Sequence, residues 1–232
     1  MHLPSLTEAR LLRRYKRFLA DVEIPGQGLT VAHCPNPGAM TGIAARGARC
    51  WLSHHESPAR KLAWTLEIVE ADGTLVGINT NTPNALAEEA IRSGVIEELA
   101  GYDNIRREAA AGEASRLDFL LTGEAWPRTW VEVKNVHLMR QPGLAEFPDS
   151  VTTRGAKHLT ELASLARKGE RAVQLFIIQR GDCARLAPAA DIDPAYAEAL
   201  KAAQADGVEV LAYACEITLQ AITVTHSVEV VL

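Results

Sequence analysis

The chain lacks the features that would place it in a membrane or mark it for export. It has 232 residues, and no apolar run approaches the roughly 18 residues that a membrane-spanning helix needs. The N-terminal segment, MHLPSLTEARLLRRYKRF, has no apolar stretch followed by the small residues of a signal-peptide cleavage site. These absences predict a cytoplasmic protein without a membrane partner.

The cysteines are few and widely separated. Cys34, Cys50, Cys183 and Cys215 include no C-x-x-C pair, which argues against both a zinc site and a disulfide framework. We expect buried thiols. The sequence also has no internal repeat and no low-complexity segment, and its 47% hydrophobic composition can fill the core of one large domain or of two smaller ones.

Charge is unevenly divided along the chain. The net charge of −5 opposes a nucleic-acid partner if the whole chain is considered. Up to Thr82, however, there are nine basic and seven acidic residues, a balance of +2, whereas the remainder carries −7. The basic residues concentrate between Arg10 and Arg17. Because a local patch decides whether phosphate can bind, the N-terminal part is a candidate nucleic-acid surface.

The first 82 residues predict a small all-β domain. Five candidate strands, the first of them the long LLRRYKRFLADVEI, are separated by the turn sequences PGQG, PNPG, SPAR and ADG. Five strands joined by hairpins fit an OB-like β-barrel. The cap and turn formers from Asn79 to Asn84 predict a boundary between domains 1–82 and 83–232.

Two strands of this barrel supply candidate nucleic-acid contacts. Along a continuous first strand, Arg14 and Lys16 share one face and Arg17 follows, while Arg49 and Trp51 share a face of another strand. Cations beside an aromatic ring can follow a phosphate backbone and stack on its bases. The alternative is that Trp51 belongs to the core and the arginines form a solvated edge.

The second domain alternates helices and strands. Helices are predicted at 84–101, with Asn84 as N-cap and Gly101 as the stop, at 153–168 and at 194–207. The segment 172–178, apolar except for Gln174, predicts a strand buried on both faces, and 139–153 is expected to be irregular. The order helix, three strands, helix, strand, helix, strand predicts an α/β domain with a mixed central sheet.

The segment Arg116–Val136, RLDFLLTGEAWPRTWVEVKNV, predicts a β-hairpin with unusual polar positions. Asp118 on its first strand, and Glu132 and Lys134 on its second, are expected on one face of the sheet. Under a covering helix these charges are costly unless they are compensated. A divalent cation held by the two carboxylates and the intervening backbone carbonyl would compensate them. The alternative is a surface salt bridge from Lys134 to one of the acids.

This pattern of an Asp followed by Glu-x-Lys resembles the PD-(D/E)xK nuclease superfamily, although Leu117 stands where the motif name has proline. The motif is short, but the order of helices and strands agrees with it. The first helix is expected to supply a further metal-binding acid. Glu89 is the candidate for that acid and Glu88 the alternative.

The second predicted helix carries polar residues that we expect to support the site. Lys157 and Glu161 are i, i+4 neighbours, and His158 and Glu161 are i, i+3 neighbours. Arg154 lies one turn earlier and completes the supporting group. The alternative interpretation of the Lys157–Glu161 spacing is a surface salt bridge worth a few tenths of a kcal/mol.

Five separated stretches resemble one family over nearly the whole chain. HCPNPGAM, SRLDFLL, VEVKNVHL, FPDSVTTRGAKHLTEL and GVEVLAYAC are similar to the sugar fermentation stimulation protein family. The resemblance implies an N-terminal OB-like domain joined to a nuclease-like domain, DNA binding, and a regulatory effect on sugar metabolism. It also implies that Asp118, Glu132 and Lys134 correspond to the nuclease motif.

The expected function is therefore a DNA-binding protein with a metal-dependent phosphodiesterase site. Asp118, Glu132 and Glu89 would hold Mg²⁺ or Mn²⁺, and Lys134 would position water or stabilise charge on the phosphate. Two alternatives stay open, a non-catalytic DNA-binding regulator with the same fold and an RNA-directed binder or nuclease. Nothing in the sequence predicts an oligomeric state.

Overall fold

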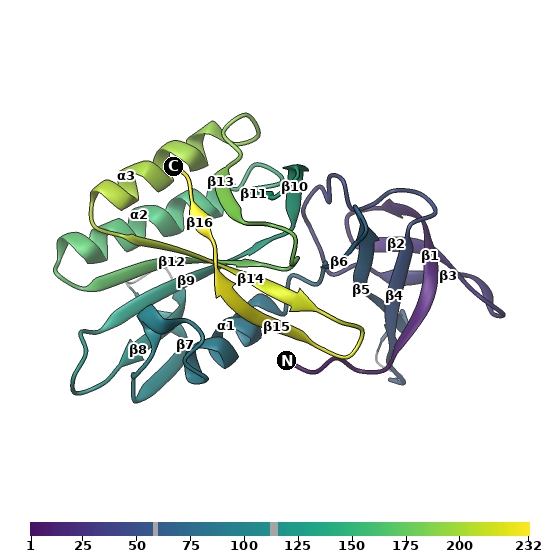
Figure 1. The fold of residues 1–232 in the computed structure, drawn as a ribbon, viewed down its shortest axis with the longest axis horizontal. Coiled ribbons are helices and arrows are strands. Elements are labelled where there is room, and N and C mark those ends of the chain that lie inside the picture. The colour runs from purple at the N-terminus through teal and green to yellow at the C-terminus, as the bar shows by residue number, and fades with distance from the viewer. Residues whose placement is uncertain (58–59, 112–115) are drawn as a thin grey trace.

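The computed structural model describes residues 1–57, 60–111 and 116–232. Figure 1 shows a small β-barrel beside a larger layered α/β unit. Both have the architecture predicted above, an OB domain whose barrel closes through five strands, followed by an α/β domain with mixed sheets. The four cysteines are buried thiols, as expected. In the described part of the chain, no helix has the length and apolar character needed to cross a membrane.

The barrel is built from β1 to β5, and β6 extends its edge. The order in the sheet is β3-β2-β1-β4-β5-β6, and β3 also pairs with β5, which closes the barrel. Inward-facing side chains such as Leu11, Val22 and Leu52 are fully buried and form its core. The turn predicted at SPAR lies partly outside the described residues. The strands are β1 Leu6–Tyr15, β2 Leu19–Ile24, β3 Gly28–His33, β4 Arg49–His54, β5 Trp64–Ala71 and β6 Thr74–Gly77.

The long first strand predicted from the sequence is in fact a hairpin. β1 ends at Tyr15, and Lys16 and Arg17 have positive φ angles of 47° and 64°. These angles reverse the chain so that Tyr15 pairs with Leu19 at the start of β2. Arg14 and Lys16 therefore do not share a strand face, and that prediction is wrong. The turn contains neither glycine nor proline, so the usual sequence signals for it are missing.

The α/β domain is a mixed six-stranded sheet with helices on both faces. Its order is β15-β14-β12-β9-β8-β7, with parallel pairing only among β9, β12 and β14. Helix α1 covers one face, and α2 and α3 cover the other (Figure 1). The strands are β7 Asn104–Ala110, β8 Arg116–Thr122, β9 Thr129–Val136, β12 Arg171–Ile178, β14 Glu209–Ile217 and β15 Ile222–Ser227; the helices are α1 Pro83–Arg92, α2 Thr153–Arg167 and α3 Pro194–Ala205.

Helix α1 is shorter than predicted. It ends at Arg92, with Ser93 as C-cap, and Gly94 follows at φ +76°. A glycine in this left-handed conformation is a common helix terminator, so the helix stops before Gly94. The expected continuation to Gly101 is reduced to the short 3₁₀ helix η1, Glu97–Leu99.

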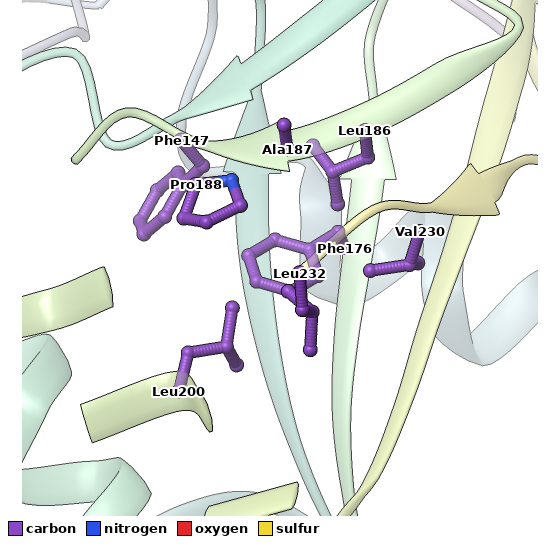
Figure 2. A pocket seen from close by; sticks show the side chains of 8 residues that line it. All are labelled: Phe147, Phe176, Leu186, Ala187, Pro188, Leu200, Val230 and Leu232. Atoms are coloured by element: carbon purple, nitrogen blue, oxygen red, sulfur yellow. The ribbon is translucent and has the colours of Figure 1, made fainter. Parts of the chain in front are cut away.

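The segment expected to be irregular forms part of a second sheet. Strands β10 Leu138–Gln141 and β11 Leu144–Phe147 form a hairpin that β13 Arg185–Pro188 and β16 Glu229–Val230 extend to four strands. Figure 2 shows Leu232 next to Phe176, with Val230 and Leu200 on opposite sides of the same space. The space among them has no room for a water molecule, so we interpret this region as a packing seam.

Hydrogen bonds fix the barrel against the α/β domain. The backbone N–H of Gly77 donates to the carbonyl of Gln179 at 2.9 Å, and the side-chain amide of Gln179 donates to the carbonyl of Asn79 at 3.1 Å. On the other side of the junction, the N–H of Met40 donates to Asp149 Oδ2 at 3.0 Å. A side chain at Gly38 would overlap the Asp149 carboxylate, so the two domains approach closely here.

Candidate active site

Strands β8 and β9 separate next to the candidate acids. Their paired residues run only from Leu121 and Thr129 to Phe119 and Val131. Asp118 lies just beyond the last pair, and its Oδ2 accepts the backbone N–H of Val133 at 2.8 Å. In a continuous pair of β-strands, a backbone carbonyl would accept the Val133 N–H. Here the Asp118 carboxylate accepts it instead. Because the strands separate here, the N–H of Val133 is free to bind the Asp118 side chain.

Helix α1 holds the other oxygen of Asp118. Asn84, in the first turn of the helix, donates its side-chain amide to Asp118 Oδ1 at 2.8 Å. Asn84 was predicted to be the N-cap of this helix, but Thr82 occupies that position. One signal in the sequence pointed to this contact. Asn84 stands at the start of the helix that was expected to supply an acid to the site.

Glu132 lies in the centre of a polar cluster beneath helix α2. Its side chain is 4% exposed, and Oε1 accepts from Lys134 Nζ at 2.5 Å and from His158 Nδ1. Arg154 Nε–H donates to His158 Nε2 at 3.3 Å. Since Nε2 accepts, the imidazole hydrogen is assigned to Nδ1, which donates to Glu132. The second oxygen of Glu132, Oε2, is buried and has no partner among the described residues.

The two carboxylates have opposite pKa shifts. Burial, and then the negative charge of Glu132, raise the pKa of Asp118 above its ordinary value. Burial also raises the pKa of Glu132, but hydrogen bonds and charge from His158 and Lys134 outweigh burial and leave it below its ordinary value. Asp118 is therefore the acid whose charge is less well compensated by the protein.

These residues fit a divalent cation. An added cation would give Glu132 Oε2 a partner and would compensate the charge of Asp118, and carboxylate oxygens are ligands that Mg²⁺ and Mn²⁺ accept. Among the residues that the structure describes, however, no three or more His, Cys, Asp or Glu side chains form a metal-binding group. Other ligands would come from water or from a bound phosphate, as is usual for Mg²⁺.

The cluster opens into a cleft between the two domains. One cavity of about 340 Å³ is lined by Asn84, Asp118, Glu132, Lys134 and other residues of the α/β domain, together with Thr80 and Asn81 at the end of the barrel domain. A second cavity, of about 480 Å³, extends toward the barrel and its wall includes Arg17. The two share Thr80, Val133, Lys134, Asn135 and Arg154, so we call them together the inter-domain cleft.

The structure does not bring the expected helix acid into the site. The Glu89 carboxylate binds the amino group of Met1 at 2.6 Å and is 55% exposed. Glu88 pairs with Arg92 and Arg107. Both lie about a turn further along α1 than Asn84, which occupies the place next to Asp118. The prediction that Glu89 is a metal ligand is therefore corrected. The helical periodicity of the sequence did not show which turn of α1 faces the hairpin.

Two of the four residues expected on α2 reach the site. His158 faces Glu132 and Arg154 supports His158, as described above. Lys157 is exposed, and neither Lys157 nor Glu161 lines the inter-domain cleft. In the described chain, these two residues form no ion pair with each other. The i, i+3 contact expected between His158 and Glu161 is replaced by the contact of His158 across to strand β9.

The predicted nucleic-acid surface on the barrel is largely corrected. Trp51 is 4% exposed and has no face available to a base. Arg49 pairs with Glu70 through two hydrogen bonds, from its Nε and its Nη2, to the two carboxylate oxygens. Arg14 donates to the backbone carbonyls of Arg17 at 2.9 Å and Asn36 at 2.6 Å, so it supports the loops instead of facing solvent. Lys16 and Arg17 are exposed.

Comparison with known proteins agrees with this architecture. Residues 81–221 match the family model described as "Sugar fermentation stimulation protein RE domain", and residues 12–78 match the "SfsA N-terminal OB domain". The chain belongs to the sugar fermentation stimulation protein family. The family is linked by its name to sugar fermentation.

Similar proteins cover the chain almost completely. The sugar fermentation stimulation protein homolog of Maricaulis maris is 58% identical over 99% of this chain and 98% of its own length. The homolog of Agrobacterium fabrum is 53% identical over 97% and 95%. A solved structure, that of Pyrococcus furiosus SfsA in complex with Ca²⁺, has a TM-score of 0.89 at 30% identity and covers 100% of this chain and 98% of the other.

Proposed function

We propose that the protein is a divalent-metal-dependent nuclease of the PD-(D/E)xK type that acts on phosphodiester bonds of nucleic acid, DNA in preference to RNA. In this proposal domain 1–82 contributes to binding and domain 83–232 carries the reaction. The observation that carries the proposal is the buried Oε2 of Glu132, which has no partner among the described residues, next to the half-buried Asp118 carboxylate and a lysine in an open cleft. The Ca²⁺ complex of a similar protein supports a divalent ion.

The cation would be held by Asp118 and Glu132. When bound, Mg²⁺ or Mn²⁺ would polarise the phosphate and lower the pKa of an attacking water. Glu132 is kept charged for this role because His158 and Lys134 hold its pKa low. Val133 N–H and Asn84 keep the Asp118 carboxylate in a fixed orientation before a ligand arrives, which reduces reorganisation in the transition state.

Lys134 is the candidate for charge stabilisation at the phosphate. Its Nζ is 2.5 Å from Glu132 Oε1 and its side chain is 14% exposed, so it lies at the surface of the cleft, next to the proposed metal ligands. An ammonium group in this position can orient water or stabilise negative charge that develops on the phosphate. His158 is a positioning residue, because it acts on Glu132 and its other nitrogen is bound by Arg154.

A second candidate function is a non-catalytic nucleic-acid-binding regulator with the same fold. The observation that favours it is the engagement of Lys134 by Glu132, which would leave no free ammonium group if the ion pair persisted in the complex. Binding without cleavage would then be the activity, and Asp118 and Glu132 would serve only to hold an ion.

Cleavage assays decide between these functions. Single- and double-stranded DNA and RNA are incubated with the protein and Mg²⁺, Mn²⁺ or chelator. Under the proposal, cleavage requires the metal, and Lys134→Met lowers turnover by on the order of 10²-fold or more, the usual scale for losing one such group. Asp118→Asn abolishes the metal-dependent activity.

Two exposed residues provide controls. Lys168→Met removes a lysine at the far end of α2, and Glu124→Gln removes an acid at the exposed end of the β8–β9 hairpin. Both should cleave at the wild-type rate. A wild-type protein that binds these nucleic acids tightly but cuts none of them with either metal would overturn the nuclease proposal in favour of the regulator.

A further inference from the structure

We infer that one nucleic-acid strand, not a closed duplex, follows a path from the inter-domain cleft across the β1–β2 turn to the exposed ring of Phe18 and the half-buried ring of His33. The inference rests on the proposed function for the cleft end of this path. The barrel end is carried by separate observations on the turn and on the two rings.

The depth of the cleft selects for a single strand. Glu132 is 4% exposed, so a phosphodiester must enter the cleft to reach it. The hydrogen bonds of Gln179 to the barrel and of Met40 to Asp149 hold the two walls together. Cavities of about 340 and 480 Å³ fall in the range that holds small-molecule ligands. They accommodate nucleotides of one strand, whereas a double helix, whose major groove alone is about 12 Å wide, is too large.

Cations lie on both walls of this cleft. Lys134 and Arg154 belong to the α/β side, and Arg17 comes from the barrel side. Arg17 and Arg154 are exposed, so their guanidinium groups are accessible to phosphate oxygens. Phosphate contacts from arginine position a strand without reading its sequence, which fits the non-specific entry of a strand into the cleft.

The turn that presents Arg17 is held in an unfavourable conformation. Lys16 and Arg17 both have left-handed φ angles, which non-glycine residues adopt at a cost. Arg14 stabilises the turn by donating to the carbonyls of Arg17 and Asn36, and its buried Nε has no partner within residues 1–57, 60–111 and 116–232. Strain of this kind concentrates at functional sites. Glycine would fit this backbone better, so a functional reason for arginine is indicated.

Beyond the turn, the path reaches a pair of aromatic rings. Phe18 is 45% exposed, and its ring lies 6.5 Å from the ring of His33 with an interplanar angle of 25°. His33 also lines a cavity of about 260 Å³ with Arg60 and Lys61. His33 is half-buried, so the exposed ring of Phe18 is the one open to a base. An exposed aromatic ring beside cations is the arrangement on which bases of a single strand stack.

Binding can be measured without cleavage. Fluorescence anisotropy in the presence of chelator compares a single-stranded 12-mer with a blunt duplex of the same sequence, each made as DNA and as RNA. We expect the single strand of at least one of the two nucleic acids to bind at least tenfold more tightly than its duplex. If the single strand and the blunt duplex bound with equal affinity, both as DNA and as RNA, the inference would be overturned.

Two variants give different signatures along the path. Arg17→Gly should weaken binding of the single strand by about tenfold and reduce the slope of log K on log salt by about 0.7, the value for one phosphate contact. Its melting temperature should stay equal or rise, since glycine relieves the strained φ. Phe18→Ala should also weaken binding by about tenfold, within the range for loss of one stacked base, but should leave the salt slope unchanged.

Matched controls come from the same barrel. Arg46→Ala removes an exposed arginine that lines neither cavity of the cleft, and Leu29→Ala removes an apolar side chain that is 75% exposed. Neither should change binding. If Leu29→Ala weakened binding as much as Phe18→Ala, or if Arg17→Gly left affinity and slope unchanged, the path would be wrong.

The outcomes also separate this inference from the nuclease proposal. Single-strand binding that depends on Arg17 and Phe18, in a protein that never cleaves, would retain the path and overturn the nuclease. Metal-dependent cleavage that is insensitive to both variants would retain the nuclease and overturn the path.

Discussion

Asn84 donates its side-chain amide to Asp118 Oδ1 at 2.8 Å, at the point where the first helix was expected to contribute an acid. A neutral amide there orients the carboxylate without adding negative charge. The site therefore has two acids, Asp118 and Glu132, whose pKa values burial and neighbouring groups shift in opposite directions. This relationship leads to the first prediction.

Replacing the amide by an acid should strengthen metal binding. Asn84→Asp would place a third carboxylate against Asp118, and affinity for divalent ions increases with the number of charged ligands. We expect Mn²⁺ to bind on the order of tenfold more tightly in calorimetry. Without metal, the same variant should melt at a lower temperature than the wild type, because two carboxylates would then repel each other. Unchanged Mn²⁺ affinity would show that residue 84 does not face the ion.

Removing the charge of Asp118 should stabilise the metal-free protein at neutral pH. Because the pKa of Asp118 is raised in the folded state, its charged form opposes folding at pH values above its unfolded pKa, and this effect vanishes below that pKa. In Asp118→Asn, the amide can accept from Val133 and donate to Asn84 after that side chain flips. Thermal unfolding with chelator should give a higher melting temperature at pH 7 than for the wild type.

The stabilising effect of Asp118→Asn should be smaller or absent at pH 3. With metal, the wild type is the protein that gains stability. Mn²⁺ should raise its melting temperature and leave that of Asp118→Asn almost unchanged. A variant that is less stable than the wild type at both pH values would contradict the interpretation that burial of charge dominates at this position.

Metal affinity should rise with pH in the wild type. A carboxylate must lose its proton to bind a metal, and the raised pKa of Asp118 moves this requirement to higher pH. Calorimetric titration with Mn²⁺ should show one or two sites, tighter binding as pH increases through the pKa of Asp118, and proton release at the lower pH values. In Asp118→Asn the binding should be clearly weaker.

Glu89 offers a direct test of the corrected ligand set. Its carboxylate binds the amino group of Met1, so Glu89→Gln should leave Mn²⁺ affinity within about twofold of the wild type. The same titration measures it. A loss comparable to that of Asp118→Asn would restore Glu89 to the metal site.

Asp149 should stabilise the domain junction above acidic pH. Burial raises its pKa, but the hydrogen bond and charge of His137 and the N–H of Met40 outweigh burial and hold the pKa below its ordinary value. Its contribution is then present above the unfolded pKa and is lost as pH falls through the lower folded pKa. Asp149→Asn should reduce the free energy of unfolding at pH 7 by about 1–3 kcal/mol.

Chemical denaturation between pH 2 and pH 7 measures this contribution. The difference between Asp149→Asn and the wild type should shrink at the acidic end. Glu124→Gln, in an exposed loop, should differ little from the wild type throughout. A difference for Asp149→Asn that stayed constant with pH would mean that ionisation of Asp149 is not involved.

Much of the α/β domain could be predicted because its signals are local. The periodic pattern of α2 and the largely apolar β12 specify their elements through neighbouring residues, and both were placed within a few residues. The end of α1 was missed although its signal was present, since Gly94 in a left-handed conformation terminates the helix. The β1–β2 turn had no such signal, because Lys16 and Arg17 are residues that rarely adopt positive φ.

The sequence by itself determined the chemistry of the candidate site, namely the two acids and the lysine on a hairpin and the family to which the chain belongs. Only the tertiary structure decided that Asn84 and not Glu89 lies against Asp118, and that Arg14 supports two loops while Arg17 lines the cleft. The physical reason is that local periodicity assigns a residue to a helix or strand face. Which turn of that helix meets a strand 34 residues away depends on how the helix packs on the sheet.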